Sequence, residues 1–148
     1  MSHIVTIQTE LRDLAAIKAA CKRMGWELLE GQHAFKWYGR YVGDYRAFEK
    51  QLADQGIAVK DYGKCDHAIR VPGAEYEIGL VQKGGKIVPL WDFYSPGGLG
   101  NIKQENGMGG FLQAYATEKA KLEARRKGYT VTERTLPTGE IQLQVRVP

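Results

Sequence analysis

Residues 66–93, DHAIRVPGAEYEIGLVQKGGKIVPLWDF, decide the fold of this chain. Three runs in this stretch are rich in apolar and β-branched residues and predict strands: 66–71, 75–82 and 86–93. They are joined by Pro72-Gly73 and by Lys83-Gly84-Gly85, residue types that are typical of hairpin turns. Pro89 has no N–H to donate to a ladder, so we expect the third strand to lie at a sheet edge or to bulge near that residue.

Three segments outside this stretch each predict a helix that ends at a glycine. The endings are Met24-Gly25-Trp26, Gln55-Gly56-Ile57 and Lys127-Gly128-Tyr129, and glycine can adopt the left-handed conformation that closes a helix. In the first helix Asp13 is a good N-cap, and an apolar stripe follows at helical spacing: Leu14, Ile17, Cys21 and Met24. The middle helix is expected from about Asp44 to Leu52.

Strands are predicted around these helices. Each helix ending leads into an apolar run: WELLE at 26–30, IAVKD at 57–61 and YTVTE at 129–133. Alternation also predicts a strand at 3–11, before the first helix, and another at 140–147, which should form a hairpin with 129–136. Residues 94–110 carry many glycines and no periodicity, and they predict a loop.

These elements together predict one α+β domain covering residues 1–148. Its expected architecture is a mainly antiparallel sheet with about three helices packed on one face. A chain of 148 residues, 43% hydrophobic and 26% charged, has the size and composition of a single globular domain and differs from disordered and fibrous proteins. The net charge of +4 permits an acidic partner without requiring one.

Location and redox state can also be predicted. No apolar run reaches the roughly 18 residues that span a bilayer, and the N-terminus lacks the layout of a signal peptide, so we expect a cytoplasmic protein without a membrane contact. Because Cys21 lies on the apolar stripe of the first helix, it is expected to be a buried free thiol, and no disulfide with Cys65 is predicted.

Motifs for catalysis, cofactors and metals are weak or missing. The glycine-rich loop has neither of the two common phosphate-binding patterns, and Cys65-Asp66-His67 supplies too few ligands for a zinc site. Glu75 and Glu77 share a strand face, which favours an exposed charged face of a hairpin over acid–base chemistry. We therefore predict no catalytic, cofactor-binding or metal-binding residues, while an enzyme whose site is assembled from scattered strand residues stays open as a third hypothesis.

The most unusual segment is 35–48, FKWYGRYVGDYRAF, which holds six of the fifteen aromatic residues. Aromatic rings beside cations can anchor a protein interface, or they can stack unpaired bases while the cations contact phosphates. Alternatively, Phe35, Tyr45 and Phe48 line the core while the other residues cover its rim. The candidate binding residues, for a protein or a nucleic acid, are Lys36, Trp37, Arg40, Tyr41 and Arg46.

Residues spread along the chain resemble the conserved plastid and cyanobacterial open-reading-frame family thirty-five, a domain of unknown function that also occurs in bacteria and phages. The matching positions are Met1-Ser2-His3, Thr6-Ile7, Thr9, Arg12-Asp13, Lys64, Asp66, Ile69, Tyr76, Ile78-Gly79, Trp91-Asp92, Tyr115, Ala124, Gly128 and Val131. The resemblance implies a small non-catalytic protein, often encoded near an AAA+ ATPase, with no catalytic residues to carry over. This chain departs from the family at about Tyr38 to Asp61, where we expect an inserted helix and strand.

We therefore expect a non-enzymatic accessory protein that binds another protein through the aromatic and basic residues around 37–46 and the loop at 94–110, with an AAA+ ATPase as the candidate partner. The alternative is a nucleic-acid-binding protein that prefers single strands, in which Trp37 and Tyr41 stack on bases and the neighbouring cations bind phosphates.

Overall fold

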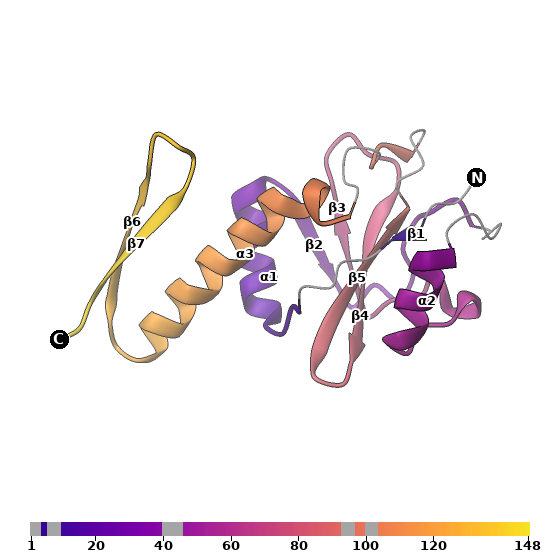
Figure 1. The fold of residues 1–148 in the computed structure, drawn as a ribbon, viewed down its shortest axis with the longest axis horizontal. Helices are drawn as coiled ribbons and strands as arrows, with labels where there is room; N and C mark the ends of the chain where they lie inside the picture. The colour runs from indigo at the N-terminus through magenta and orange to yellow at the C-terminus, as the bar shows by residue number, and fades with distance from the viewer. Residues whose placement is uncertain (1–3, 6–9, 40–45, 93–96, 100–103) are drawn as a thin grey trace.

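The computed structural model describes residues 4–5, 10–39, 46–92, 97–99 and 104–148. The elements in chain order are β1 (Ile4–Val5), α1 (Leu14–Met24), β2 (Glu27–Glu30), α2 (Arg46–Asp54), the 3-10 helix η1 (Val59–Asp61), β3 (His67–Arg70), β4 (Glu77–Lys83), β5 (Lys86–Asp92), α3 (Gln104–Arg126), β6 (Thr130–Thr135) and β7 (Ile141–Arg146). Figure 1 shows a central sheet between helices, with the β6–β7 hairpin beyond α3 at one end of the molecule.

The central sheet has five strands in the order β1-β5-β4-β3-β2, and every neighbouring pair is antiparallel. All three strands predicted in residues 66–93 are confirmed. The turn between β4 and β5 places Gly84 and Gly85 at φ 57° and 80°. Two successive positive φ values are what a two-residue hairpin turn requires, so glycine fixes this register.

The expectation that Pro89 marks a sheet edge or a bulge was wrong. β5 lies between β1 and β4, and its register with β4 runs without a break through the Leu80–Pro89 pair. The carbonyl of Leu80 accepts the N–H of Asp66, on the side of β3. The backbone hydrogen-bonding groups of Leu80 therefore point toward β3, and Leu80 and Pro89 form a non-hydrogen-bonded pair of the β4–β5 ladder. This ladder needs no N–H from Pro89.

Both faces of the sheet are buried. Ile69, Ile78 and Trp91 point to one face and pack with the inner sides of α1 and α3. Ala68, Val88 and Leu90 alternate with them and pack with Leu52 of α2 on the other face. The predicted α+β class with a mainly antiparallel sheet and three helices is confirmed, but the helices are divided between the two faces (Figure 1).

Helix α1 begins and ends as its sequence predicts. The Asp13 carboxylate accepts the N–H groups of Ala15 and Ala16, and Gly25 closes the helix at φ 76°. Burial, which alone would raise the pKa of Asp13, is outweighed by these hydrogen bonds and by Arg126, so its pKa is lowered. Cys21 is buried and free, as expected, and burial raises the pKa of its thiol to about 12.

Two predicted segments differ from the structure. Residues 57–58 have no regular secondary structure and 59–61 form η1 instead of a strand, because only Ile57 is buried there while Val59 is 39% exposed. Residues 104–110 belong to α3 instead of a loop. Met108 is fully buried, and Gly110 lies beneath the end of the Met24 side chain, so packing against α1 outweighs the low helix propensity of the glycines.

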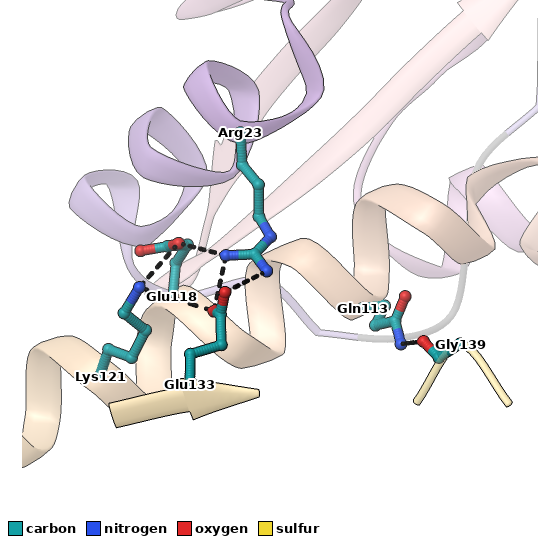
Figure 2. A network of polar contacts seen from close by, with 6 residues as sticks. All are labelled: Arg23, Gln113, Glu118, Lys121, Glu133 and Gly139. Atoms are coloured by element: carbon teal, nitrogen blue, oxygen red, sulfur yellow. Dashed lines mark hydrogen bonds and ion pairs between the residues drawn. The ribbon is translucent and has the colours of Figure 1, made fainter. Parts of the chain in front are cut away.

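The predicted C-terminal hairpin is confirmed, and it is fastened to the helices by charged side chains (Figure 2). The guanidinium of Arg23 in α1 binds both carboxylate oxygens of Glu133 in β6 at 2.7 Å and also contacts Glu118 in α3. Lys121 reaches the same two carboxylates at 3.5 and 3.6 Å. Exposed fractions of the four side chains lie between 13% and 27%, so water screens these contacts only in part.

This network predicts a loss of stability in acid. The hydrogen bonds from Arg23 lower the pKa of Glu133, so the folded state favours its charged form. At pH values above the pKa of a glutamate in the unfolded chain, about 4.3, the lowered pKa of Glu133 stabilises the folded state. This contribution is lost as the pH falls through the pKa of Glu133 in the folded state. We expect Glu133→Gln to lower the free energy of unfolding by about 1 kcal/mol at pH 7. Urea melts at several pH values should show this difference shrink below pH ~4; a difference independent of pH would contradict it.

Candidate functional site

The segment 31–39, which follows β2 and opens the aromatic and basic stretch, is held against the sheet by a series of hydrogen bonds. The N–H of Gly31 donates to Nδ1 of His67 at 3.0 Å. Further along, the N–H of Phe35 donates to the carbonyl of Gly63, and the N–H of Cys65 donates to that of His33, both at 3.0 Å. The backbone of this segment is therefore fixed although only Ala34 takes part in a β-bridge.

A buried carboxylate fixes the middle of the segment. Glu77 in β4 is 3% exposed, and its Oε1 accepts the side-chain N–H of Gln32 at 2.9 Å and the N–H of Lys36 at 3.1 Å. The N–H of Glu77 donates in turn to the carbonyl of Lys36 at 2.9 Å. A buried carboxylate requires such donors, so Glu77 and the segment position each other. The expectation that Glu75 and Glu77 form an exposed charged face was wrong for Glu77, while Glu75 is exposed.

A second buried carboxylate fixes the exposed end of the segment. Asp92, the last residue of β5, is fully buried, and its Oδ2 accepts the N–H of Tyr38 at 3.1 Å. Tyr38 is 43% exposed, and Lys36 is exposed as well. Two acidic groups inside the sheet thus hold the backbone from which an aromatic and a cationic side chain reach solvent.

The neighbouring aromatic residues are packed inward. Phe35 is buried, and its ring occupies the space above Gly79 of β4 where any larger residue would place its Cβ. Trp37 is half-buried; it meets Tyr62 edge to face at 6.2 Å between ring centroids, and its indole covers Gly63. Phe35 therefore belongs to the core, as one interpretation of the sequence proposed. Trp37 packs against Gly63 and Tyr62, next to the exposed Tyr38.

The predicted binding residues are only partly placed by the structure. Lys36 and Trp37 lie on adjacent positions of the anchored segment, with Lys36 exposed and Trp37 half-buried. Arg40 and Tyr41 lie outside the described residues, and of Arg46 only the position at the start of α2 is described. Sequence reasoning counted Tyr38 among the aromatic residues of the segment but left it out of the candidate site. Tyr38 directly follows Trp37, and neighbouring side chains of an extended segment point to opposite sides. A tryptophan that packs inward therefore predicts that Tyr38 faces solvent.

An open pocket of about 220 Å³ lies between η1 and β4. Its lining includes Ile57, Asp61, Lys64, Cys65, Asp66 and Lys83. Asp61 pairs with Lys64 at 3.7 Å, and Asp66 accepts the N–H of Gln82 at 2.7 Å. The thiol of Cys65 donates to the carbonyl of Gln32, and burial raises its pKa to about 11. Asp61, Lys64 and Asp66 thus have local partners, and the Cys65 thiol stays protonated at neutral pH, so this thiol is not an activated nucleophile.

The described part of the glycine-rich stretch before α3 serves packing. The carbonyl of Gly97 accepts the N–H groups of Glu75 and Tyr76 at 2.9 and 2.8 Å. A Cβ on Gly97 would collide with the ring of Tyr76, and one on Gly98 would approach the backbone of Ala74 at 2.7 Å. The Tyr76 ring therefore explains glycine at position 97, and the close approach of the Ala74 backbone explains it at position 98.

Comparison of the chain with protein-family models, with curated proteins and with solved structures found no match. Within the described residues, no cluster of three or more histidine, cysteine or acidic side chains is placed to hold a metal ion. The helices of that same part of the chain lack the combination of length and apolar character needed to cross a bilayer.

Proposed function

We propose that this chain is a non-enzymatic accessory protein that binds another protein through an aromatic surface, defined here as Lys36, Trp37 and Tyr38. The observation that carries the proposal is the anchoring of Tyr38: its backbone is bonded to a fully buried carboxylate while the residue is 43% exposed. A rigid aromatic side chain loses little conformational entropy when a partner covers it, and Tyr and Trp dominate the binding energy of protein interfaces.

The partner is proposed to be an AAA+ ATPase, as the sequence resemblance implies, and Arg40, Tyr41 and Arg46 stay predicted extensions of the same surface. A cytoplasmic location is part of the proposal. Two buried, unbridged cysteines support it, because disulfides are rare in reducing compartments.

The environment of Trp37 favours a protein partner over a nucleic acid. Base stacking needs an open aromatic face, whereas this indole lies against Gly63 and Tyr62.

Quantitative affinity purification from the native host tests the proposal. Compared with the wild-type chain, Tyr38→Ala and Lys36→Glu are expected to reduce recovery of the main partner, Tyr38→Ala by about tenfold or more. Trp37→Ala/Tyr41→Ala should act in the same direction. Matched controls are Val147→Ala and Lys22→Glu, which change an exposed apolar and an exposed basic residue elsewhere. Unchanged recovery with Tyr38→Ala, or recovery of nucleic acid whose binding weakens steeply with salt, would overturn the proposal.

A further inference from the structure

The outer edge of β7 is an open strand edge. The β6–β7 sheet has two strands, and within the described residues β7 pairs with β6 alone. The ion pairs that fasten the hairpin to the helices reach Glu133 in β6, and Gln113 bonds the turn residue Gly139 at 3.3 Å (Figure 2). Within the described residues, the backbone N–H and C=O groups of β7 therefore form ladder hydrogen bonds on one side of the strand only. Two-stranded sheets are marginally stable unless further strands extend them or other elements cover them.

The direction of these free groups follows from the hairpin register. The N–H of Leu136 donates to the carbonyl of Glu140 at 2.8 Å, which makes this pair a hydrogen-bonded one. Hydrogen-bonded and non-bonded pairs alternate along an antiparallel ladder, so even-numbered residues of β7 bond β6. The N–H and C=O groups of Ile141, Leu143 and Val145 consequently point to the open edge.

The sequence of this strand has the same alternation of apolar and polar residues when it is read in either direction, with opposite charges at its two ends. Residues 140–146 read Glu-Ile-Gln-Leu-Gln-Val-Arg, with Leu143 at the centre. An antiparallel copy aligned on Leu143 sets Ile141 opposite Val145, Gln142 opposite Gln144 and Glu140 opposite Arg146. Residues directly opposite each other share a face, so apolar groups meet apolar groups and the two opposite charges meet. Leu143 pairs with its own copy as a hydrogen-bonded pair, because its backbone groups point outward on both strands.

Alternative registers lose this complementarity. A shift of one residue brings apolar residues opposite glutamines, and a shift of two residues separates Glu140 from Arg146. Edge strands are often kept from pairing with other chains by being short and by carrying charged residues. β2, an edge strand of the five-stranded sheet, has four residues and begins and ends with an exposed glutamate. β7 is longer, and its edge lacks this protection. No lysine or proline interrupts β7.

The apolar face of the hairpin is incompletely covered. Val131, Ile141 and Leu143 are half-buried, but Val145 is 47% exposed and Val147 is 63% exposed. They lie on the same side as Glu133, which faces the helices. Val145 lies near the C-terminal end of β7, opposite the position that Ile141 of a second copy would occupy, and Val147 directly follows the strand.

We propose that β7 pairs antiparallel with β7 of a second copy of this chain, forming a symmetric dimer with a continuous four-stranded sheet. Each copy uses the same surface, as twofold symmetry requires. Figure 1 places the hairpin on the far side of α3 from the five-stranded sheet. Because directly opposite residues share a face, the helices of both copies lie on the same face of the new sheet and are related by the twofold axis. The dimer uses residues separate from the aromatic surface and does not depend on the proposed function.

Charge exchange across the strand pair tests this proposal. Arg146→Glu places a glutamate opposite Glu140 twice in each dimer, and Glu140→Arg places two arginines opposite each other at the same two positions. Each variant should raise the dimer dissociation constant about tenfold or more in sedimentation velocity. An equimolar mixture of the two variants should form a heterodimer as tight as the wild type, because both contacts then join opposite charges. The matched control is Arg134→Glu, an exposed residue of β6 away from the open edge.

A backbone variant checks the pairing itself. The N–H of Val145 points away from β6, so Val145→Pro removes two hydrogen bonds of the dimer, one for each copy, and none of the hairpin ladder. We expect this variant to be monomeric and to melt at a temperature close to that of the wild-type monomer. A wild-type chain that stays monomeric at all concentrations would overturn the proposal. The proposal would also be overturned if either charge-reversal variant or Val145→Pro dimerised as tightly as the wild type. The same holds if the equimolar mixture of Arg146→Glu and Glu140→Arg failed to form a heterodimer.

Discussion

Glu77→Ala is expected to lower the free energy of unfolding by about 2–4 kcal/mol. The substitution removes the acceptor for the side chain of Gln32 and for the N–H of Lys36, and it leaves both donors beside a buried strand. Because Glu77 also fixes the backbone that carries Tyr38, partner recovery should fall together with stability. Urea denaturation followed by circular dichroism measures the first effect, and affinity purification measures the second.

Glu75→Ala is the matched control for this prediction. Glu75 lies two residues earlier and is exposed, so its removal should change stability by no more than about 0.5 kcal/mol. Glu77→Gln keeps one side-chain oxygen as an acceptor and should fall between the two. Equal stability of Glu77→Ala and Glu75→Ala would show that the buried carboxylate does not anchor the segment.

Gly79→Ala is expected to lower the free energy of unfolding by about 2–3 kcal/mol. Its Cβ would occupy the position of the Phe35 ring, and this ring is 4% exposed inside the core on the α2 side of the sheet. The ring must move, and the anchored segment moves with it. Thermal melting and the near-ultraviolet circular dichroism of the aromatic residues should both change.

Gly109→Ala separates this steric effect from the general effect of replacing glycine. Gly109 lies inside α3, is exposed and has no atom within 4 Å of an added Cβ. Alanine there should raise stability by about 0.5–1 kcal/mol through helix propensity. If both substitutions shift stability in the same direction, the contact between Gly79 and Phe35 is not the cause.

The helix ends and most of the strands, though not the one expected at 57–61, were predictable because their signals are local. Asp13 caps α1 through neighbouring N–H groups, and Gly25 closes it through its own backbone conformation. Gly84 and Gly85 determine the turn between β4 and β5 in the same way. Such signals do not depend on the rest of the molecule, and the prediction from them agreed with the structure.

The failures involve contacts between distant residues. Nothing near Gly110 in the sequence shows that Met24 will cover it, so the start of α3 was predicted as a loop. Likewise, the burial of Glu77 depends on Gln32 and Lys36, more than forty residues earlier. The division of the helices between two sheet faces depends on Leu52 packing against Val88 and Leu90.

The candidate surface was predictable in composition but not in geometry. The clustering of aromatic and basic residues identified segment 35–48, and Lys36 and Trp37 lie in its anchored part. Which ring faces solvent depends on Asp92 and Gly63, which lie on other elements. Tyr38 therefore emerged as the exposed ring only when the fold was known.

Site-specific photo-cross-linking in the native host tests the central claim, that this chain acts by binding a protein at Tyr38. A photoreactive phenylalanine at position 38 is predicted to form one dominant adduct with a partner protein, while the same group at the exposed position 50 of α2 gives none. An adduct with nucleic acid at position 38, or equal protein adducts at both positions, would contradict the account.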